Sequence, residues 1–301
     1  MSSIEFEEQG DDFRLMGSPP FPQSVFVESH RIDECVNYAR QKYSGRIAIS
    51  PLGMGFELSN LSFLLRFPWI EHLTIQNSDM VDISAVSSLR YLRYLSISGK
   101  PKQVLSLSEF PELAELRIDW WPKLVLGDVL PKLRVLDMSW YACPTGDLTA
   151  LPSMPTLEEL SLVQSRHLAL SGIERLRSSL RKIVISYFAD LVDLFPLTAF
   201  SESGLEILEF ANCPNIKEHR LVSNLKSLRR LAFNRCGEIP NLRFLDDLPA
   251  LESFSFVGTN VVDGDLTPCL RLQFAGFLNK RHYSHRRSDF PPPSSPTVLR
   301  G

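Results

Sequence analysis

The chain has 301 residues, of which 44% are hydrophobic and 22% charged, and its formal net charge is −3. These values are typical of a folded soluble protein, and a nearly neutral chain is not a general binder of nucleic acids or membrane surfaces. Five cysteines, an odd number in a long chain, indicate reduced thiols and predict a cytoplasmic protein. There is no run of about 18 apolar residues, and the N-terminus is acidic, so neither a membrane span nor a secretory signal is predicted.

Residues 1–44 predict an N-terminal arm followed by a capping helix. The arm contains an acidic run and the turn-rich stretch GSPPFP, which indicate partial mobility. In the following RIDECVNYARQKY, one helical stripe carries Ile32, Val36, Ala39 and Tyr43. Ser29 is the expected N-cap, and we expect this helix to cover the edge of the first repeat.

From residue 45 to 278 the sequence repeats itself. A degenerate first copy, RIAIS, is expected to point Ile47 and Ile49 inward. Ten further copies share the pattern L-x-x-Φ-x-Φ, where Φ is apolar, at spacings of 18 to 25 residues. They begin at Ile70, Leu92, Leu113, Leu133, Leu157, Leu180, Leu205, Leu228, Leu251 and Cys269. Counting from these starts, positions four and six fall on one side of an extended segment, which predicts a strand with one buried face.

This pattern resembles the leucine-rich repeat family. Two copies, LEILEFANCPNI and LRRLAFNRCGEI, resemble its cysteine-containing type. The resemblance implies an α/β fold, a right-handed solenoid of about ten to eleven coils. A curved parallel sheet would form its concave face, and short helices, 3₁₀ turns and irregular segments its convex face. It also implies that Cys213 and Cys236, at position nine, are small buried residues at the end of their strands.

Residues between the buried positions are expected to point out of the sheet and line the concave face. Position two alternates in charge along the repeats, with one interruption at Ala114. Neighbouring strands place these side chains about 5 Å apart, so the column predicts a ladder of ion pairs that mainly provides solubility. A ladder that neutralises itself also disfavours a polyanionic partner.

Two pairs of adjacent aromatic residues end neighbouring strands, in ELRIDWWP and VLDMSWYACP. Position nine turns back towards the core, so Trp121, Tyr141 and Phe188 are expected to be buried. Position eight lies on the rim, so Trp120 and Trp140 are expected to lie side by side and partly exposed. Exposed tryptophans near arginines have the composition of an interaction hot spot, although they could simply shield the strand ends. The candidate contact residues are Trp120, Trp140, Tyr187, Arg93, Arg117, Arg134, Asp119 and Asp137.

After the last repeat, residues 279–301 predict a basic segment and a proline-rich disordered tail, with Phe277 and Leu278 closing the core. The basic stretch NKRHYSHRR could contact nucleic acid, but a solvated cap explains it better. His282 and His285 alone make a poor metal site.

No motif indicates catalysis: the sequence has no P-loop, no G-x-G-x-x-G, no H-E-x-x-H and no G-x-S-x-G. The sequence therefore predicts a monomeric, non-catalytic module that binds a protein partner without a cofactor or a metal. The alternative is a protein that associates with nucleic acid through its C-terminal basic segment.

Overall fold

A computed structural model describes residues 8–9, 13–17, 22–165 and 167–292. The chain divides into two compact units, Met1–Met138 and Ser139–Gly301, which are described separately. Residues 293–301, most of the predicted C-terminal tail, and most of the acidic N-terminal run lie outside the described residues.

In the first unit the sheet strands follow one another in the order β1-β2-β3-β4-β5-β6-β8-β10. Their bounds, with those of the small pair β7 and β9, are β1 Glu8–Gln9, β2 Phe13–Met16, β3 Ser24–Phe26, β4 Arg46–Ile49, β5 His72–Ile75, β6 Tyr94–Ile97, β7 Leu105–Ser106, β8 Glu115–Asp119, β9 Leu124–Val125 and β10 Val135–Ser139. The helical elements are α1 Ile32–Lys42 and the 3₁₀ turns η1 Ser62–Arg66, η2 Ser78–Met80, η3 Ser84–Ser88 and η4 Leu107–Glu109.

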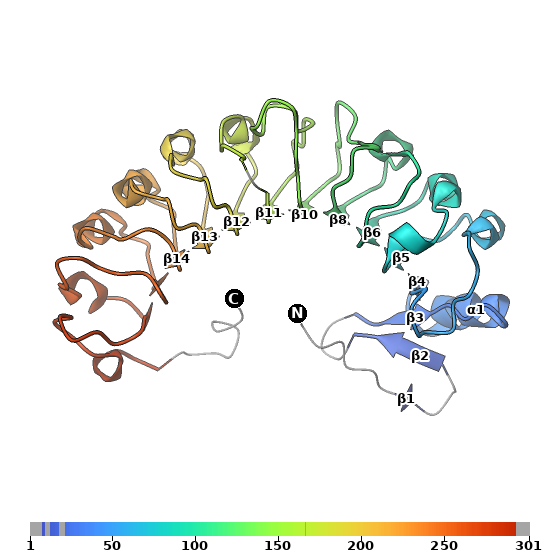
Figure 1. Cartoon of the computed structure of the whole chain (residues 1–301), viewed down its shortest axis with the longest axis horizontal. Coiled ribbons are helices and arrows are strands. Elements are labelled where there is room, and N and C mark those ends of the chain that lie inside the picture. Colours follow the sequence, from blue (N-terminus) through green and yellow to red (C-terminus); the bar gives the residue numbers. More distant parts are fainter. Residues whose placement is uncertain (1–7, 10–12, 18–21, 166, 293–301) are drawn as a thin grey trace. The chain divides into compact units, whose positions relative to one another are not determined.

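In the second unit six parallel strands follow the order β11 to β16. They are β11 Glu159–Val163, β12 Lys182–Ser186, β13 Ile207–Ala211, β14 Arg230–Asn234, β15 Ser253–Ser255 and β16 Phe274–Gly276. The turns are η5 Ile173–Leu176, η6 Phe195–Phe200, η7 His219–Asn224, η8 Arg243–Asp247, η9 Thr267–Cys269 and η10 Arg287–Asp289. Within each unit the strands lie on the inner side of the coils and the turns on the outer side, as the predicted solenoid requires (Figure 1).

The buried rows follow the repeat. The position-four residues Leu116, Leu136, Leu160, Ile183, Leu208 and Leu231 are all at most 2% exposed, as predicted. In the second unit the ladder pairs Leu160 with Ile183, Ile183 with Leu208, and Leu208 with Leu231. Ile47 and Ile49 are fully buried too, so the degenerate first copy is confirmed. One coil cannot bury its apolar face alone, and stacking in register is what excludes water from these rows.

The outer turns have a local origin in the sequence. Before several of them, an Asn or Asp side-chain oxygen accepts the backbone N–H two residues further on. This is seen at Asn60, Asp82, Asp193 and Asn241, with distances of 2.7 to 3.1 Å. Such a bond reverses the chain over a few residues and favours a tight turn over a long helix.

The register predicted for the last repeat is wrong by three residues. Phe254, at position four of its coil, pairs with Ala275 and not with Leu272. The last copy therefore starts at Leu272, and Phe277 occupies position six, where its ring stacks on that of Phe256 at 5.1 Å. The start at Cys269 was plausible because CLRLQF also fits the pattern, but Cys269 ends the turn η9.

The N-terminal end also differs from the prediction. Helix α1 lies between the parallel strands β3 and β4, so it forms the outer side of the first coil and does not cover its edge. The first parallel strand, β3, is covered instead by the antiparallel strand β2, which lies in the arm that was expected to be partly mobile. Ser29 does not cap the helix, because its hydroxyl oxygen accepts the backbone N–H of Glu57 at 2.7 Å.

At the C-terminal end the core continues past residue 278. Leu278 is 60% exposed, whereas Tyr283 and Phe290 are buried. The ring of Tyr283 lies against those of Phe256 and Phe277, and its hydroxyl accepts the N–H of Val261 at 3.1 Å. Part of the basic segment therefore packs as a cap on the last coil. The division of the chain into arm, solenoid and tail at residues 44 and 278, which the sequence predicts, remains a proposal.

Candidate functional site

Position eight of each repeat is where the chain leaves its strand, and in most coils its backbone is left-handed. In the second unit Trp140, Gln164, Tyr187, Asn212 and Arg235 have φ between 51° and 63°, and Gly258 has φ 76°. Each of the five non-glycine residues donates its N–H to the position-seven carbonyl of the next coil at 2.8 Å. One repeated turn therefore projects all five side chains from equivalent places.

These five residues, with Ala189 and Pro214, line an open pocket of about 440 Å³ at the carboxyl ends of the strands. We call the five the position-eight surface. Trp140 is 42% exposed and Tyr187 51% exposed, as expected of rim residues. The sequence did not predict Gln164, Asn212 and Arg235 as contacts, because polar residues at position eight are common on any solvated surface. The position-eight column contained them all.

The position-nine residues lie in the core. Trp121, Tyr141 and Phe188 are each 1% exposed, and the indole N–H of Trp121 donates to the carbonyl of Gln103 at 3.1 Å. The prediction that one aromatic of each adjacent pair is structural is therefore confirmed. Cys213 is fully buried, whereas Cys236 is only half-buried, so the expected burial holds fully for the first cysteine alone.

The remaining predicted contact residues belong to the first unit. Trp120 is half-buried, and Arg134 is exposed. Arg117 forms an ion pair with Asp137 at 3.5 Å, and Arg93 lies 3.9 Å from a carboxylate oxygen of Glu71.

A carboxylate oxygen of Asp119 accepts the N–H of Gly99 at 2.8 Å, at the left-handed turn of the preceding coil. Asp119 thus stabilises a turn. The side-by-side arrangement of Trp120 and Trp140 stays a prediction.

Some of the ion pairs predicted for position two are present in the structure. Arg229 pairs with Glu252 at 2.6 Å, and Arg181 lies 3.9 Å from Glu206. These groups are substantially exposed, so each pair adds little stability.

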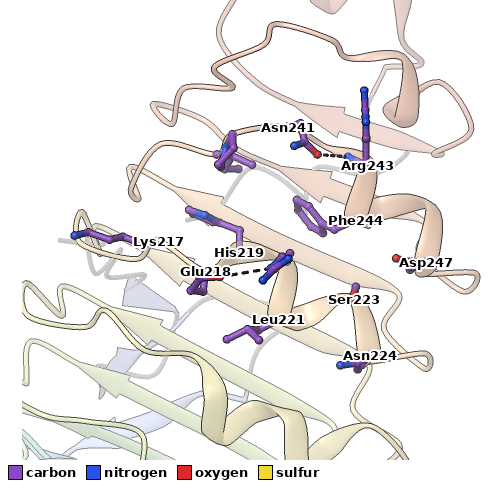
Figure 2. Close-up of a pocket in the computed structure, with 13 residues that line it drawn as sticks. Lys217, Glu218, His219, Leu221, Ser223, Asn224, Asn241, Arg243, Phe244 and Asp247 are labelled. Atoms are coloured by element: carbon purple, nitrogen blue, oxygen red, sulfur yellow. Dashed lines mark hydrogen bonds and ion pairs between the residues drawn. The ribbon is translucent and has the colours of Figure 1, made fainter.

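A larger pocket, of about 750 Å³, lies on the outer side of the second unit between η7 and η8 (Figure 2). His219 lines it but is only 2% exposed, and its ring meets that of Phe233 edge to face at 4.7 Å. Burial lowers the pKa of His219 to about 4, so the ring is neutral at pH 7. The carbonyls of Lys217 and Gly237 lie near the ring, yet neither ring nitrogen forms a hydrogen bond of normal geometry with a described residue.

The charged residues around this second pocket partly neutralise one another. Glu218 pairs with Arg220 at 3.6 Å, and Asn241 accepts the backbone N–H of Arg243 at 3.1 Å (Figure 2). The lining carries Lys217, Arg220 and Arg243 beside Glu218 and Asp247, and the neutral imidazole of His219 packs on Phe233.

The basic segment near the C-terminus is engaged with the cap. Lys280 donates to the side-chain oxygen of Asn260 at 2.7 Å, and the guanidinium of Arg287 lies 5.1 Å from the ring centre of Phe274. The nucleic-acid alternative gains no support from this arrangement. Across the described parts of the chain, no three His, Cys, Asp or Glu side chains are placed to hold a metal ion. Nor does any helix there have the length and apolar character needed to cross a bilayer.

Comparison with solved structures agrees with this architecture. An internalin of Listeria monocytogenes aligns over 89% of this chain and 84% of its own, with 16% identity and a TM-score of 0.50. The chain has the leucine-rich-repeat fold. A leucine-rich-repeat protein of Leptospira interrogans aligns over 78% of this chain and 71% of its own, with 16% identity and a TM-score of 0.42. No protein-family model and no curated protein sequence matches this leucine-rich-repeat chain.

Proposed function

We propose that this leucine-rich-repeat chain is a non-catalytic module that binds a protein partner, and that the position-eight surface of the second unit is a main contact. Repeat solenoids present extended inner surfaces of this kind to their partners. The observation that carries the proposal is the presence of two exposed large aromatics, Trp140 and Tyr187, in left-handed backbone conformation.

That conformation is unfavourable for a bulky residue. A side chain with a Cβ in the left-handed region costs on the order of 1–3 kcal/mol, and glycine or asparagine adopts it most easily. Other coils follow this preference, with Asn77 and Gly99 in the first unit and Asn212 and Gly258 in the second. Trp140 and Tyr187 therefore occupy positions where smaller residues would favour folding, which is typical of side chains that serve binding.

The other predicted contacts remain part of the proposal. Trp120, Arg93, Arg117, Arg134, Asp119 and Asp137 all belong to the first unit, and none of them is fully buried. From the sequence we also propose a cytoplasmic location, a monomeric state and the lack of a cofactor.

The test uses Trp140→Asn and Tyr187→Asn. Since asparagine suits the left-handed backbone, both variants should unfold at the same urea concentration as the wild type or at a higher one. Truncating a central aromatic of an interface typically costs about 2 kcal/mol or more, so affinity for a partner identified by pull-down should fall about thirtyfold.

Phe195→Ser is the matched control, because Phe195 is 65% exposed on the outer turn η6 of the same unit. It should bind like the wild type. Affinities of Trp140→Asn and Tyr187→Asn within twofold of the wild type would exclude this surface as the contact.

A further inference from the structure

The inner face of the second unit divides into two halves of different chemistry. From the amino ends to the middle of the strands, at positions two, three and five, charges of both signs lie close together. The pairs are Arg181 with Glu206, Arg229 with Glu252, Lys182 with Glu159, and Arg230 with Glu209, at distances of 2.6 to 3.9 Å. This half neutralises itself and offers a partner little net attraction.

The half at the carboxyl ends of the strands is almost uncharged. Position seven carries only small, apolar or amide side chains, which are Val163, Ser186, Ala211, Asn234 and Val257. The pocket beside them is lined by two aromatics, two amides, an alanine, a proline and a single charge, that of Arg235. A ligand that covers this half must be mostly uncharged, because burying unpaired charges is costly. A polyanion would need several cations here.

Arg235 is the exception, and its side chain lies close to the next coil. The side chain passes over Gly258, where an added Cβ would lie 2.8 Å from Cγ of Arg235. Arg235 forms no ion pair with any residue that the structure describes, and the pocket lining contains no carboxylate. Covering this guanidinium would favour a ligand that brings a carboxylate to it.

The row has the length of a short extended peptide. Trp140 and Arg235 are four coils apart, and parallel strands lie about 4.8 Å from one another, so the row spans roughly 19 Å. An extended chain advances about 3.3 Å per residue, so about six residues cover that distance. Ala189 and Pro214 line the same pocket as the row.

We infer that the position-eight surface binds an extended segment of about six residues from a protein partner, with apolar side chains against Trp140 and Tyr187 and a carboxylate against Arg235. This inference rests on the proposed function and specifies the chemistry of its partner. The orientation of the bound segment follows from the row, because Trp140 lies at one end of it and Arg235 at the other.

The experiment uses a synthetic array of six-residue peptides, with Phe, Leu or Pro near one end and Glu, Gln or Lys near the other. Wild-type protein should select the Glu peptides, and fluorescence anisotropy should give them about tenfold higher affinity than their Gln counterparts, as expected of a charged hydrogen bond. Arg235→Gln should reduce this ratio to less than twofold. Trp140→Asn should weaken Glu and Gln peptides alike and keep their ratio.

Arg243→Gln is the control, because Arg243 is exposed on the outer side of the same unit. It should leave the preference for Glu unchanged. The inference would be overturned if the selected peptides showed no preference for Glu or preferred Lys. It would also be overturned if the Glu-to-Gln affinity ratio stayed the same in Arg235→Gln. If no peptide is selected while partner affinity still falls in Trp140→Asn, the peptide inference fails and the proposed function stands. If partner affinity is unchanged as well, both fail.

Discussion

Replacing His219 with phenylalanine should remove a pH dependence from the stability of the protein. His219 is buried against Phe233, and burial lowers its pKa from 6.5 to about 4. In the unfolded chain the same imidazole takes up a proton near pH 6.5. Because the folded pKa is the lower one, the unfolded state binds the proton first as the pH falls. The stabilisation is complete above pH 6.5 and is lost progressively down to pH 4.

The magnitude follows from that shift. One pKa unit corresponds to about 1.4 kcal/mol, so a shift of about 2.5 units amounts to roughly 3 kcal/mol in full and about 2.5 kcal/mol at pH 4.5. At pH 7 the variant should be close to the wild type, because phenylalanine has a similar shape and removes two ring nitrogens that lack well-formed hydrogen bonds. At pH 4.5 the variant should therefore be the more stable protein by about 2 kcal/mol.

The assay is urea denaturation of both proteins at several pH values between 7 and 4.5, with the free energy of unfolding extrapolated to zero urea. His72, whose pKa burial also lowers to about 4, is present in both proteins and cancels from the difference. A difference that stays constant within about 0.5 kcal/mol over this range would refute the reasoning. An NMR titration showing His219 protonated near pH 6.5 in the folded protein would refute it too.

Four further outcomes are expected. Leu160→Ala should lower the free energy of unfolding by about 2–5 kcal/mol, and a loss below about half a kilocalorie would contradict the buried row. Trp121→Ala should cost about 3–5 kcal/mol in the same measurement, unlike the exposed Trp140, since its indole is buried and bonded to a carbonyl. Cys213 should react with a bulky maleimide only in denaturant, and fast labelling detected by mass spectrometry in the native state would disprove its burial. Tyr283→Ala should lower the melting temperature by opening the C-terminal cap, and an unchanged temperature would show that this cap adds no stability.

The local sequence determined the repeat, and with it the strands, their buried rows and the positions that face outwards. The period-2 pattern and the spacing suffice for this, because stacking identical units is the way such units can bury their apolar faces. They also suffice to separate Trp121 from its neighbour, since the inward position follows from the count along the repeat.

Both ends of the solenoid were decided only by tertiary structure. CLRLQF and LQFAGF fit the pattern equally well, and pairing with Phe254 selects the second. Serine is a common N-cap residue, but the groups of Ser29 form other hydrogen bonds. Its backbone N–H donates to the carbonyl of Gly55, and its hydroxyl oxygen accepts the N–H of Glu57. Terminal coils have a neighbour on one side alone, so their contacts come from segments outside the repeat, which its period does not describe.

The position-eight surface shows the same division. The sequence placed Trp140 and Tyr187 on the rim through their count in the repeat. It did not show that their backbone is left-handed, nor that Gln164, Asn212 and Arg235 join them around one pocket. Those properties arise because each N–H at position eight bonds to the next coil at the same distance, which repeats one turn geometry in every coil of the row. A contact between residues more than twenty positions apart is set by the stacking of coils, and the order of residues within one coil does not contain it.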